Sequence, residues 1–240
     1  MPLEVCVDSY TSLLTAVRAG ADRIELCSTL NLGGLTPSYG LMKQAITIKN
    51  LEIFVMIRPR SGDFIYDDNE WETMIYDIEK VKEMGFSGIV TGVLHNNGKI
   101  NIERMKEIVD ISYPLKVVLH RAFDDALEPI NDMEKLIDIG ICRILTSGQK
   151  PNALEGSKYI AKLQKKYGDK ITIMPCCGVN ADNIPEIYKI TGCTHYHLSG
   201  KVNVGSKMPY SSSISDLVIE RADYMLIKKA KEVLDKVLGD

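Results

Sequence analysis

The stretch GADRIELC, residues 20–27, joins the end of a helical segment to a short apolar strand and sets a pattern for the whole chain. Gly20 can adopt the left-handed conformation that ends a helix, and the strand begins three residues later. The same joint recurs at Gly85, Gly140 and Gly192, each three residues before another strand candidate. Successive glycines are 65, 55 and 52 residues apart, which fits two strand-helix units in each interval. The chain is therefore predicted to repeat one strand-helix unit.

Eight short apolar runs alternate with longer segments of helical periodicity. The predicted strands are Leu3–Asp8, Arg23–Cys27, Ile53–Pro59, Gly88–Leu94, Leu115–His120, Arg143–Ser147, Ile171–Pro175 and His195–Ser199. Parallel strands with right-handed crossovers close compactly at this length as a (β/α)8 barrel, the TIM-type α/β fold. We expect one such domain over residues 1–240. An open doubly wound sheet is the alternative, but no glycine-rich nucleotide turn follows the first strand.

The residues beyond the last predicted strand are expected to add one helix. The chain after Gly200, through Ser211-Ser212-Ser213, is predicted to form a loop. A final helix is predicted from about Asp216 to Leu238.

The composition is that of a folded protein and argues against several functional classes. Hydrophobic residues make up 45% and charged residues 25% of the chain, which argues against disorder. The net charge is −3 without long runs of one sign, so we expect no nucleic acid and no anionic membrane as partner. The longest charge-free stretch, Leu26 to Met42, contains Asn31, Pro37 and several glycines, so no membrane-spanning helix is predicted.

The first residues and the cysteines indicate a reducing compartment. The opening MPLEV lacks the basic start and apolar core of a signal peptide, so a cytoplasmic location is expected. The six cysteines lack the paired short spacings of a disulfide framework and are expected to be reduced thiols. The sequence leaves a homo-oligomer open.

Charged residues near the centres of the predicted strands indicate a polar barrel interior. Helices cover the outside of such a barrel, so these side chains are expected to face the lumen. Alternation places on the inward faces Glu4, Cys6, Asp8, Arg23, Glu25, Cys27, Met56, Arg58, Val118, His120, Arg143, Ser147, His195, His197 and Ser199. One interpretation is a buried network of mutually neutralising charges, because buried charges persist only when paired. The other interpretation is a binding site.

The carboxyl ends of the predicted strands, where ligands bind in this fold, carry cationic and polar residues. These are Asp8, Cys27, Arg58, Arg60, His120, Arg121, Asp124, Ser147, His197 and Ser199. Arginine forks match carboxylate or phosphate, so a small anionic ligand is predicted. The turns Thr146-Ser147-Gly148 and Cys177-Gly178 add backbone amides of the kind that cradle phosphate. Arg121 has the opposite parity to His120 and could instead brace a loop.

Two cysteines are candidates for a metal site. Cys6 and Cys27 share the inward faces of neighbouring strands, and soft thiolates suit Cu(I) or Zn(II). The simplest interpretation of Cys142, Cys193 and one of Cys176 or Cys177 is a small buried hydrophobic residue. Adjacent cysteines such as Cys176 and Cys177 cannot point both side chains the same way along a strand. No C-x-x-C, H-x-x-x-H or H-E-x-x-H spacing is present.

A series of motifs resembles the CutC family of copper homeostasis proteins. The motifs are EVC at residues 4–6, GADRIELC at 20–27, GGLTPS at 33–38, MIRPR at 56–60, GDF at 62–64, HRAFD at 120–124 and LTSG at 145–148. The resemblance implies a cytoplasmic TIM-type barrel associated with copper tolerance and copper binding. The family's motif positions then fall on Cys6, Arg23, Glu25, Cys27, Arg58, Arg60, His120, Arg121, Asp124, Thr146, Ser147, Gly148 and His197.

Two positions depart from the family pattern. The family usually runs through glycines after the seventh strand, where this chain has Cys176-Cys177-Gly178. It usually has an acid two residues before the histidine of the eighth strand, where this chain has His195. The first departure puts a phosphate cradle there in doubt. The second adds a metal ligand or only a buried imidazole.

Two functions from different classes follow. The first is a cytoplasmic copper homeostasis protein that binds copper, as Cu(I), through the barrel thiols Cys6 and Cys27. The alternative is a TIM-barrel enzyme that acts on a small anionic metabolite, carrying phosphate or carboxylate. In the alternative, the acid/base residues are His120, Asp124 and Glu25, and the anion-binding residues are Arg58, Arg60, Arg121, Ser147, Gly148, His197 and Ser199.

Overall fold

The computed structural model describes residues 2–208 and 218–239, and these form a (β/α)8 barrel, as predicted. The eight barrel strands are β1 (Leu3–Val7), β2 (Arg23–Leu26), β3 (Glu52–Met56), β4 (Gly88–Thr91), β5 (Lys116–Leu119), β6 (Ile141–Thr146), β7 (Thr172–Pro175) and β8 (Tyr196–Leu198). Each overlaps its predicted strand. All the ladders between them are parallel and run in the order β7-β6-β5-β4-β3-β2-β1-β8.

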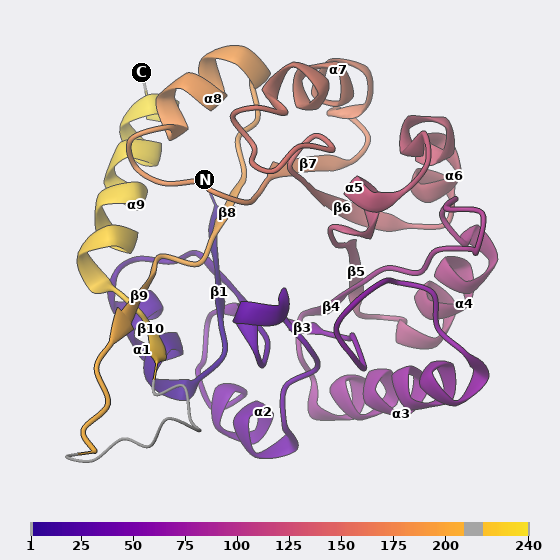
Figure 1. Ribbon diagram of the computed structural model, residues 1–240, viewed down its shortest axis with the longest axis horizontal. Coiled ribbons are helices and arrows are strands. Elements are labelled where there is room, and N and C mark those ends of the chain that lie inside the picture. The colour runs from indigo at the N-terminus through magenta and orange to yellow at the C-terminus, as the bar shows by residue number, and fades with distance from the viewer. Residues whose placement is uncertain (1, 209–217, 240) are drawn as a thin grey trace.

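Helices surround this sheet, as Figure 1 shows. They are α1 (Tyr10–Arg18), α2 (Tyr39–Ala45), α3 (Asp68–Met84), α4 (Ile102–Ser112), α5 (Ala122–Asp125), α6 (Met133–Asp138), α7 (Ser157–Tyr167), α8 (Ile184–Thr191) and α9 (Tyr224–Gly239), with short 3-10 turns η1 (Leu30–Leu32) and η2 (Pro129–Asp132). Within the described residues no helix is both long and apolar enough to cross a membrane.

The barrel has one open seam. β7 and β8 lie against one another, but no ladder of hydrogen bonds joins them within residues 172–175 and 196–198. β8 is instead held by β1, where Glu4 is in register with His197. The sheet is therefore nearly closed.

Alternation along the strands separates two apolar layers. Leu3, Val5 and Val7 of β1 face outward into the large core between strands and helices. Cys6 of β1 faces inward and belongs to a smaller cluster in the lumen with Phe54, Met56 and Met174. The predicted parity of the inward and outward faces is confirmed at these strands.

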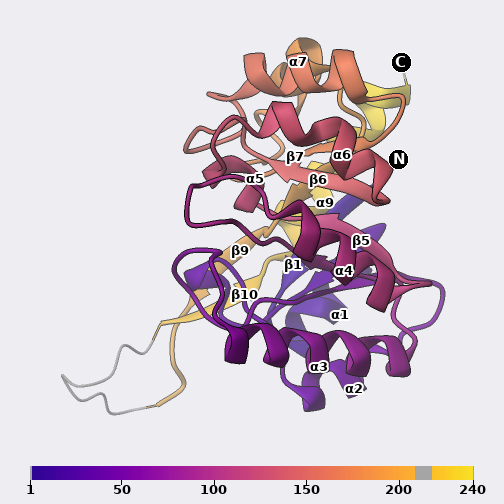
Figure 2. The same cartoon turned by 90° about the vertical axis from the view of Figure 1, so that its right-hand side faces the viewer.

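The segment after β8 differs from the prediction. A hairpin of β9 (Lys201–Val204) and β10 (Ile219–Ala222) follows, and it reaches away from the barrel on the side opposite the N-terminus (Figure 2). The last helix, α9, begins at Tyr224 rather than near Asp216, because the preceding residues pair as a strand. The predicted loop at Ser211-Ser212-Ser213 and the predicted helix start at Asp216 lie outside the described residues.

Candidate functional site

A buried ion cluster occupies the base of the barrel. The Glu4 carboxylate is fully buried and accepts from Arg23 Nε at 2.5 Å, His197 Nδ1 at 2.8 Å and Arg143 Nη1 at 3.1 Å. Burial alone would raise the pKa of Glu4, but the His197 hydrogen bond and the charges of Arg23 and Arg143 lower it below its ordinary value. Part of the predicted polar interior is therefore a paired charge network.

The ring of Phe54 packs beneath this network. The guanidinium carbons of Arg143 and Arg23 lie 4.7 Å and 5.7 Å from the ring centroid, within cation-π range. His195, just before β8, is half-buried, and burial lowers its pKa to about 4, with a further lowering from Arg23 and Arg143. None of these residues lines the cavity above, so the base of the barrel is structural.

Three potential metal ligands converge above the base. One ligand atom each of Cys6, Glu25 and His197 lies within 4.8 Å of the others, and all three residues are buried. Glu4 holds His197 through Nδ1, which leaves Nε2 as the ring atom that can bind a metal. Burial raises the pKa of the Cys6 thiol. Burial lowers the pKa of His197, but Cys6 and Glu25 outweigh it and raise that pKa well above its ordinary value.

Cys27 lies beside this group rather than in it. Its sulfur donates to Glu25 Oε1 at 3.3 Å, and burial raises the pKa of both side chains. Glu25 Oε2 is buried and has no hydrogen-bond partner among the described residues. The Cys27 sulfur is also close to the backbone of Gly34, where an added Cβ would lie 3.2 Å from it. Cys6 lines the cavity at the carboxyl ends of the strands, whereas Cys27 does not.

A cavity of about 510 Å³ opens at the carboxyl ends of the strands. Of the predicted site residues, those that line it are Cys6, Glu25, Arg58, His120, Arg121, His197 and Ser199. Those that do not line it are Cys27, Arg60, Asp124, Ser147 and Gly148. The structure therefore brings together seven of the twelve predicted site residues.

Arg58 is buried on the cavity wall and is held by backbone carbonyls. Nη1 donates to Leu32 O at 2.9 Å and Gly34 O at 3.2 Å, and Nη2 donates to Gly62 O at 2.8 Å. No carboxylate pairs with Arg58 among the described residues, and its Nε atom has no partner there. Arg58 therefore gives the cavity a positive charge that the surrounding side chains leave uncompensated.

His120 is buried beside Arg58 and is held neutral. Its Nδ1 accepts from Ala122 N at 3.1 Å, which places the ring proton of the neutral tautomer on Nε2. Burial lowers the pKa of His120 to about 3, with a contribution from Arg58. Nε2 is buried without a hydrogen-bond partner in the described structure. The ring can therefore offer a donor to a ligand.

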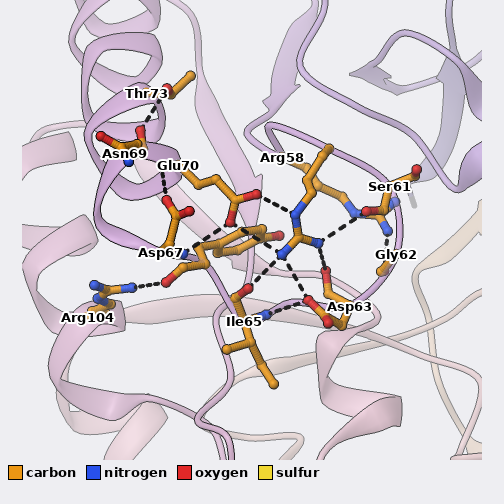
Figure 3. Close-up of polar contacts among 12 residues, drawn as sticks. Arg58, Ser61, Gly62, Asp63, Ile65, Asp67, Asn69, Glu70, Thr73 and Arg104 are labelled. Atoms are coloured by element: carbon orange, nitrogen blue, oxygen red, sulfur yellow. Dashed lines mark hydrogen bonds and ion pairs between the residues drawn. The ribbon is translucent and has the colours of Figure 1, made fainter.

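Arg60 lies away from the cavity and organises the loop that leads to α3. Nε pairs with Glu70 at 2.5 Å, and Nη2 pairs with Asp63 at 3.1 Å and donates to Ile65 O at 2.7 Å. Figure 3 shows Asp63, Ile65, Asp67 and Glu70 gathered in this network. Arg60, which was predicted to bind an anionic ligand, is therefore paired instead with Asp63 of its own loop and Glu70 of α3.

The turn after β6 cradles an internal anion, the carboxylate of Asp124. Asp124 accepts from Thr146 Oγ1 at 2.5 Å, Ser147 N at 2.8 Å and Gln149 N at 3.0 Å, and the amide of Gly148 donates to Thr146 Oγ1. The backbone amides that the sequence suggested for a ligand are thus already occupied. Asp124 has a structural part here, because its oxygens are saturated with donors.

Arg121 links this turn to the cavity. Its Nε lies 3.4 Å from Asp124 Oδ2, and its Nη2 lies 3.4 Å from the Ser147 hydroxyl. The side chain still lines the cavity and is 48% exposed. Arg121 therefore contacts the neighbouring loop, as the loop-bracing alternative expects, and also places a cationic side chain at the cavity wall.

Cys176 and Cys177 both line the cavity, whereas the sequence suggested only the backbone of Cys177-Gly178 for a ligand and the two thiols as a second choice for copper. Their sulfurs lie 3.8 Å apart on the cavity wall. The expectation that adjacent side chains diverge is wrong because β7 ends at Pro175 and Cys177 takes a left-handed φ of 68°. Hydrogen bonding from Cys176 lowers the pKa of Cys177 to about 7, with help from Arg121 and His197. The only sequence signal was the pair of thiols itself.

Comparison with known proteins places this geometry in a family. The model of the CutC family matches residues 1–202. The CutC family protein of Pasteurella multocida is 41% identical over 243 residues, covering 98% of this chain and 100% of that protein. The match of the family model ends inside β9, so most of the hairpin and all of α9 lie beyond it.

Two solved structures resemble this chain, the first in both sequence and fold and the second in fold alone. The crystal structure of the CutC protein from Streptococcus agalactiae, named for copper homeostasis, has a TM-score of 0.78 at 33% identity and covers 82% of this chain and 97% of that chain. Thiamine phosphate pyrophosphorylase from Pyrococcus furiosus has a TM-score of 0.61 at 15% identity, covering 99% and 97%. The second similarity supports the barrel fold alone.

Proposed function

Because the chain belongs to the CutC family, we propose that it is a cytoplasmic copper homeostasis protein that binds Cu(I) in the barrel cavity. The observation that carries the proposal is the convergence of Cys6, Glu25 and His197, whose ligand atoms lie within 4.8 Å of one another. A buried thiol, an imidazole and a carboxylate suit a soft or borderline ion better than Mg²⁺ or Ca²⁺. Cys27 adds a second sulfur, which is bound to Glu25.

The residues around Cys6, Glu25 and His197 suit a metal ion that is bound reversibly. Glu4 orients His197 as a carboxylate partner of a metal-binding imidazole would. Burial keeps the Cys6 and Cys27 thiols protonated, so copper binding has to release protons. We expect copper to be bound and released as cargo, with an affinity that depends on pH.

Titration with Cu(I) against a chromophoric chelator tests this proposal. The double variant Cys6→Ser/Cys27→Ser is expected to lose one bound Cu(I) per chain. Cys142→Ser is the matched control, because Cys142 is half-buried near the start of β6 and does not line the cavity, which opens at the carboxyl ends of the strands. An unchanged stoichiometry and affinity in the double variant would contradict a site at Cys6. His197→Gln, which keeps both thiols, should weaken binding at least about tenfold.

The anionic-metabolite alternative keeps one specific observation in its favour. The unpartnered Nε2 of His120 and the uncompensated charge of Arg58 both belong to the cavity wall. Calorimetry with phosphate and with a dicarboxylate, comparing the parent with His120→Gln, tests it. Loss of a charge-assisted or buried hydrogen bond should weaken anion binding by about tenfold or more. Equal binding by both proteins, or no binding by the parent, would remove this support.

A further inference from the structure

The pair Cys176 and Cys177 forms a second thiol group on the same cavity, and it shares no residue with the group of Cys6, Glu25 and His197. Cys176 is 2% exposed and Cys177 is half-buried. The hydrogen bonds of the neighbouring backbone hold both residues, because Cys176 N donates to Thr146 O at 3.0 Å and Ala153 N donates to Cys177 O at 3.0 Å. The two sulfurs are therefore fixed in a defined position.

The distance between the two sulfurs suits one metal ion that is bound by both of them. Two sulfurs that bind one ion at about 2.3 Å with tetrahedral to trigonal angles lie about 3.8 to 4.0 Å apart. The sulfurs of Cys176 and Cys177 are 3.8 Å apart. The thiols are therefore spaced for binding one ion without rearrangement of the chain.

A disulfide fits this pair less well. Consecutive Cα atoms are about 3.8 Å apart, whereas disulfides usually join Cα atoms at about 4.4 Å or more. A bond between these adjacent residues would therefore be strained and easily reduced. The geometry favours metal binding over a redox role.

The charge near the two sulfurs and the number of available ligands indicate which class of metal ion the pair would bind. Arg121 lies on the same cavity wall and offers a positive charge to sulfur anions. Within residues 2–208 and 218–239, no group of three metal-ligating side chains includes either cysteine, so a closed four-ligand zinc site is not formed. We propose that Cys176 and Cys177 bind a second thiophilic ion of the Cu(I) class on the cavity wall, as two ligands of a bent, trigonal site in which one coordination position stays open.

Cu(I) titration of nested variants tests this site independently of the first. In the Cys6→Ser/Cys27→Ser background, one Cu(I) per chain should remain bound. Adding Cys176→Ser and Cys177→Ser should remove it, whereas adding Cys142→Ser should not. Each single change, Cys176→Ser or Cys177→Ser, should weaken the remaining binding at least about tenfold if both sulfurs are ligands. Retention of that copper by the variant lacking all four cysteines would overturn the proposal.

A second measurement uses the unaltered chain and does not depend on the folding of any variant. Bound Cu(I) should protect Cys177, the half-buried and more acidic thiol of the pair, from alkylation by iodoacetamide, as mapped by mass spectrometry, while Cys142 is modified equally with and without copper. Equal alkylation of Cys177 in both conditions would overturn the site. Recovery of the pair as a disulfide that copper neither prevents nor replaces would overturn it in favour of a redox pair. If the Cys6→Ser/Cys27→Ser variant bound as much Cu(I) as the parent while Cys176 and Cys177 proved to be ligands, only the function proposed above would be contradicted.

Discussion

Glu4 is the residue on which the buried charges of the barrel converge. Two arginines and one histidine donate to a carboxylate that has no contact with water. Removing one member of such a network leaves its partners buried and uncompensated. The position is therefore expected to matter for folding first and for any ligand only through His197.

We predict that Glu4→Gln lowers the free energy of unfolding by about 3 to 5 kcal/mol, because Arg23 and Arg143 lose their shared counter-charge. Glu134→Gln is the control, since Glu134 is 54% exposed and pairs with Lys170 at the surface. That change should cost no more than about 1 kcal/mol. Urea unfolding monitored by circular dichroism compares the two. Similar losses in both variants would mean that the buried network carries no special stability.

His120 should make the protein sensitive to acid. Its pKa is about 3 in the folded chain, against about 6.5 when unfolded, so below pH 6.5 the unfolded state binds the proton first. Stability is then lost as the pH falls from about 6.5 toward 3, with a slope of up to about 1.4 kcal/mol per pH unit. His120→Gln should flatten this slope without changing it above neutrality. Chemical unfolding across that pH range measures it, and parallel curves would contradict the prediction.

The affinity of the protein for Cu(I) should also depend on pH, and this dependence is measured while the chain stays folded. Burial raises the pKa of Cys6, so its proton must leave when the metal binds. Between about pH 6 and about pH 8, the Cu(I) association constant should rise by about tenfold per pH unit for each proton released. Competition titrations at fixed chelator strength measure the slope. A constant affinity would indicate that Cu(I) binds without any protonated ligand, and so not at Cys6.

The sequence predicts which face of a strand a residue occupies better than it predicts which other residue that side chain contacts. Strand parity correctly put Glu4, Arg23 and Arg143 inside the barrel. The same patterns assigned Arg60 to anion binding and Asp124 to acid/base chemistry, whereas the structure pairs Arg60 with Glu70 and surrounds Asp124 with amides of the next loop. These partners come from segments 10 and 23 residues away, and their approach depends on loop conformations that periodicity does not encode.

At the scale of elements, the loop before α3 shows how a helix start is secured. Asp67 accepts from Glu70 N at 2.8 Å, and Glu70 accepts in return from Asp67 N at 3.1 Å, forming a capping box. Arg60 binds the same Glu70. The loop that carries Arg58 to the cavity is therefore tied to a helix terminus, as Figure 3 shows.

We predict that Asp67→Ala lowers the free energy of unfolding by about 1 kcal/mol, because the backbone N–H of Glu70, in the first turn of α3, loses its partner. Asp68→Ala is the control, since Asp68 is fully exposed and makes only a 3.3 Å ion pair with Arg104. Its effect should stay within about 0.5 kcal/mol. Thermal unfolding compares them. An equal effect of both changes would place the stabilisation in the first-turn charge rather than in the cap.

Strand and helix order was predictable from the sequence, but the residues after Gly200 were not. The eight strands follow from repeated apolar runs and glycine joints, which are local signals. The hairpin does not have such a signal, because β10 covers only Ile219–Ala222 and contacts α1, where Ala222 N donates to Ser12 Oγ across 210 residues. The same holds for Cys177, whose left-handed φ brought its sulfur to the cavity.

At the scale of the whole molecule, the seam between β7 and β8 should be the first part of the barrel to open. β2 is paired on both sides, by β1 and β3, whereas β8 is paired only with β1. We predict that amides in residues 195–199 exchange with deuterium at least about tenfold faster than those in residues 23–27. Hydrogen-exchange mass spectrometry resolves the two segments. Equal protection would show that side-chain packing closes the seam as firmly as a ladder would.

The partners of Glu4 also order the events of synthesis. A ribosome releases Glu4 in the first strand, but Arg143 follows 139 residues later and His197 follows 193 residues later. Arg23 follows only 19 residues after Glu4, so the first ion pair of the network can form early. The full set of donors is complete only once β8 has been synthesised, so the burial of the first strand cannot reach its final stability before then.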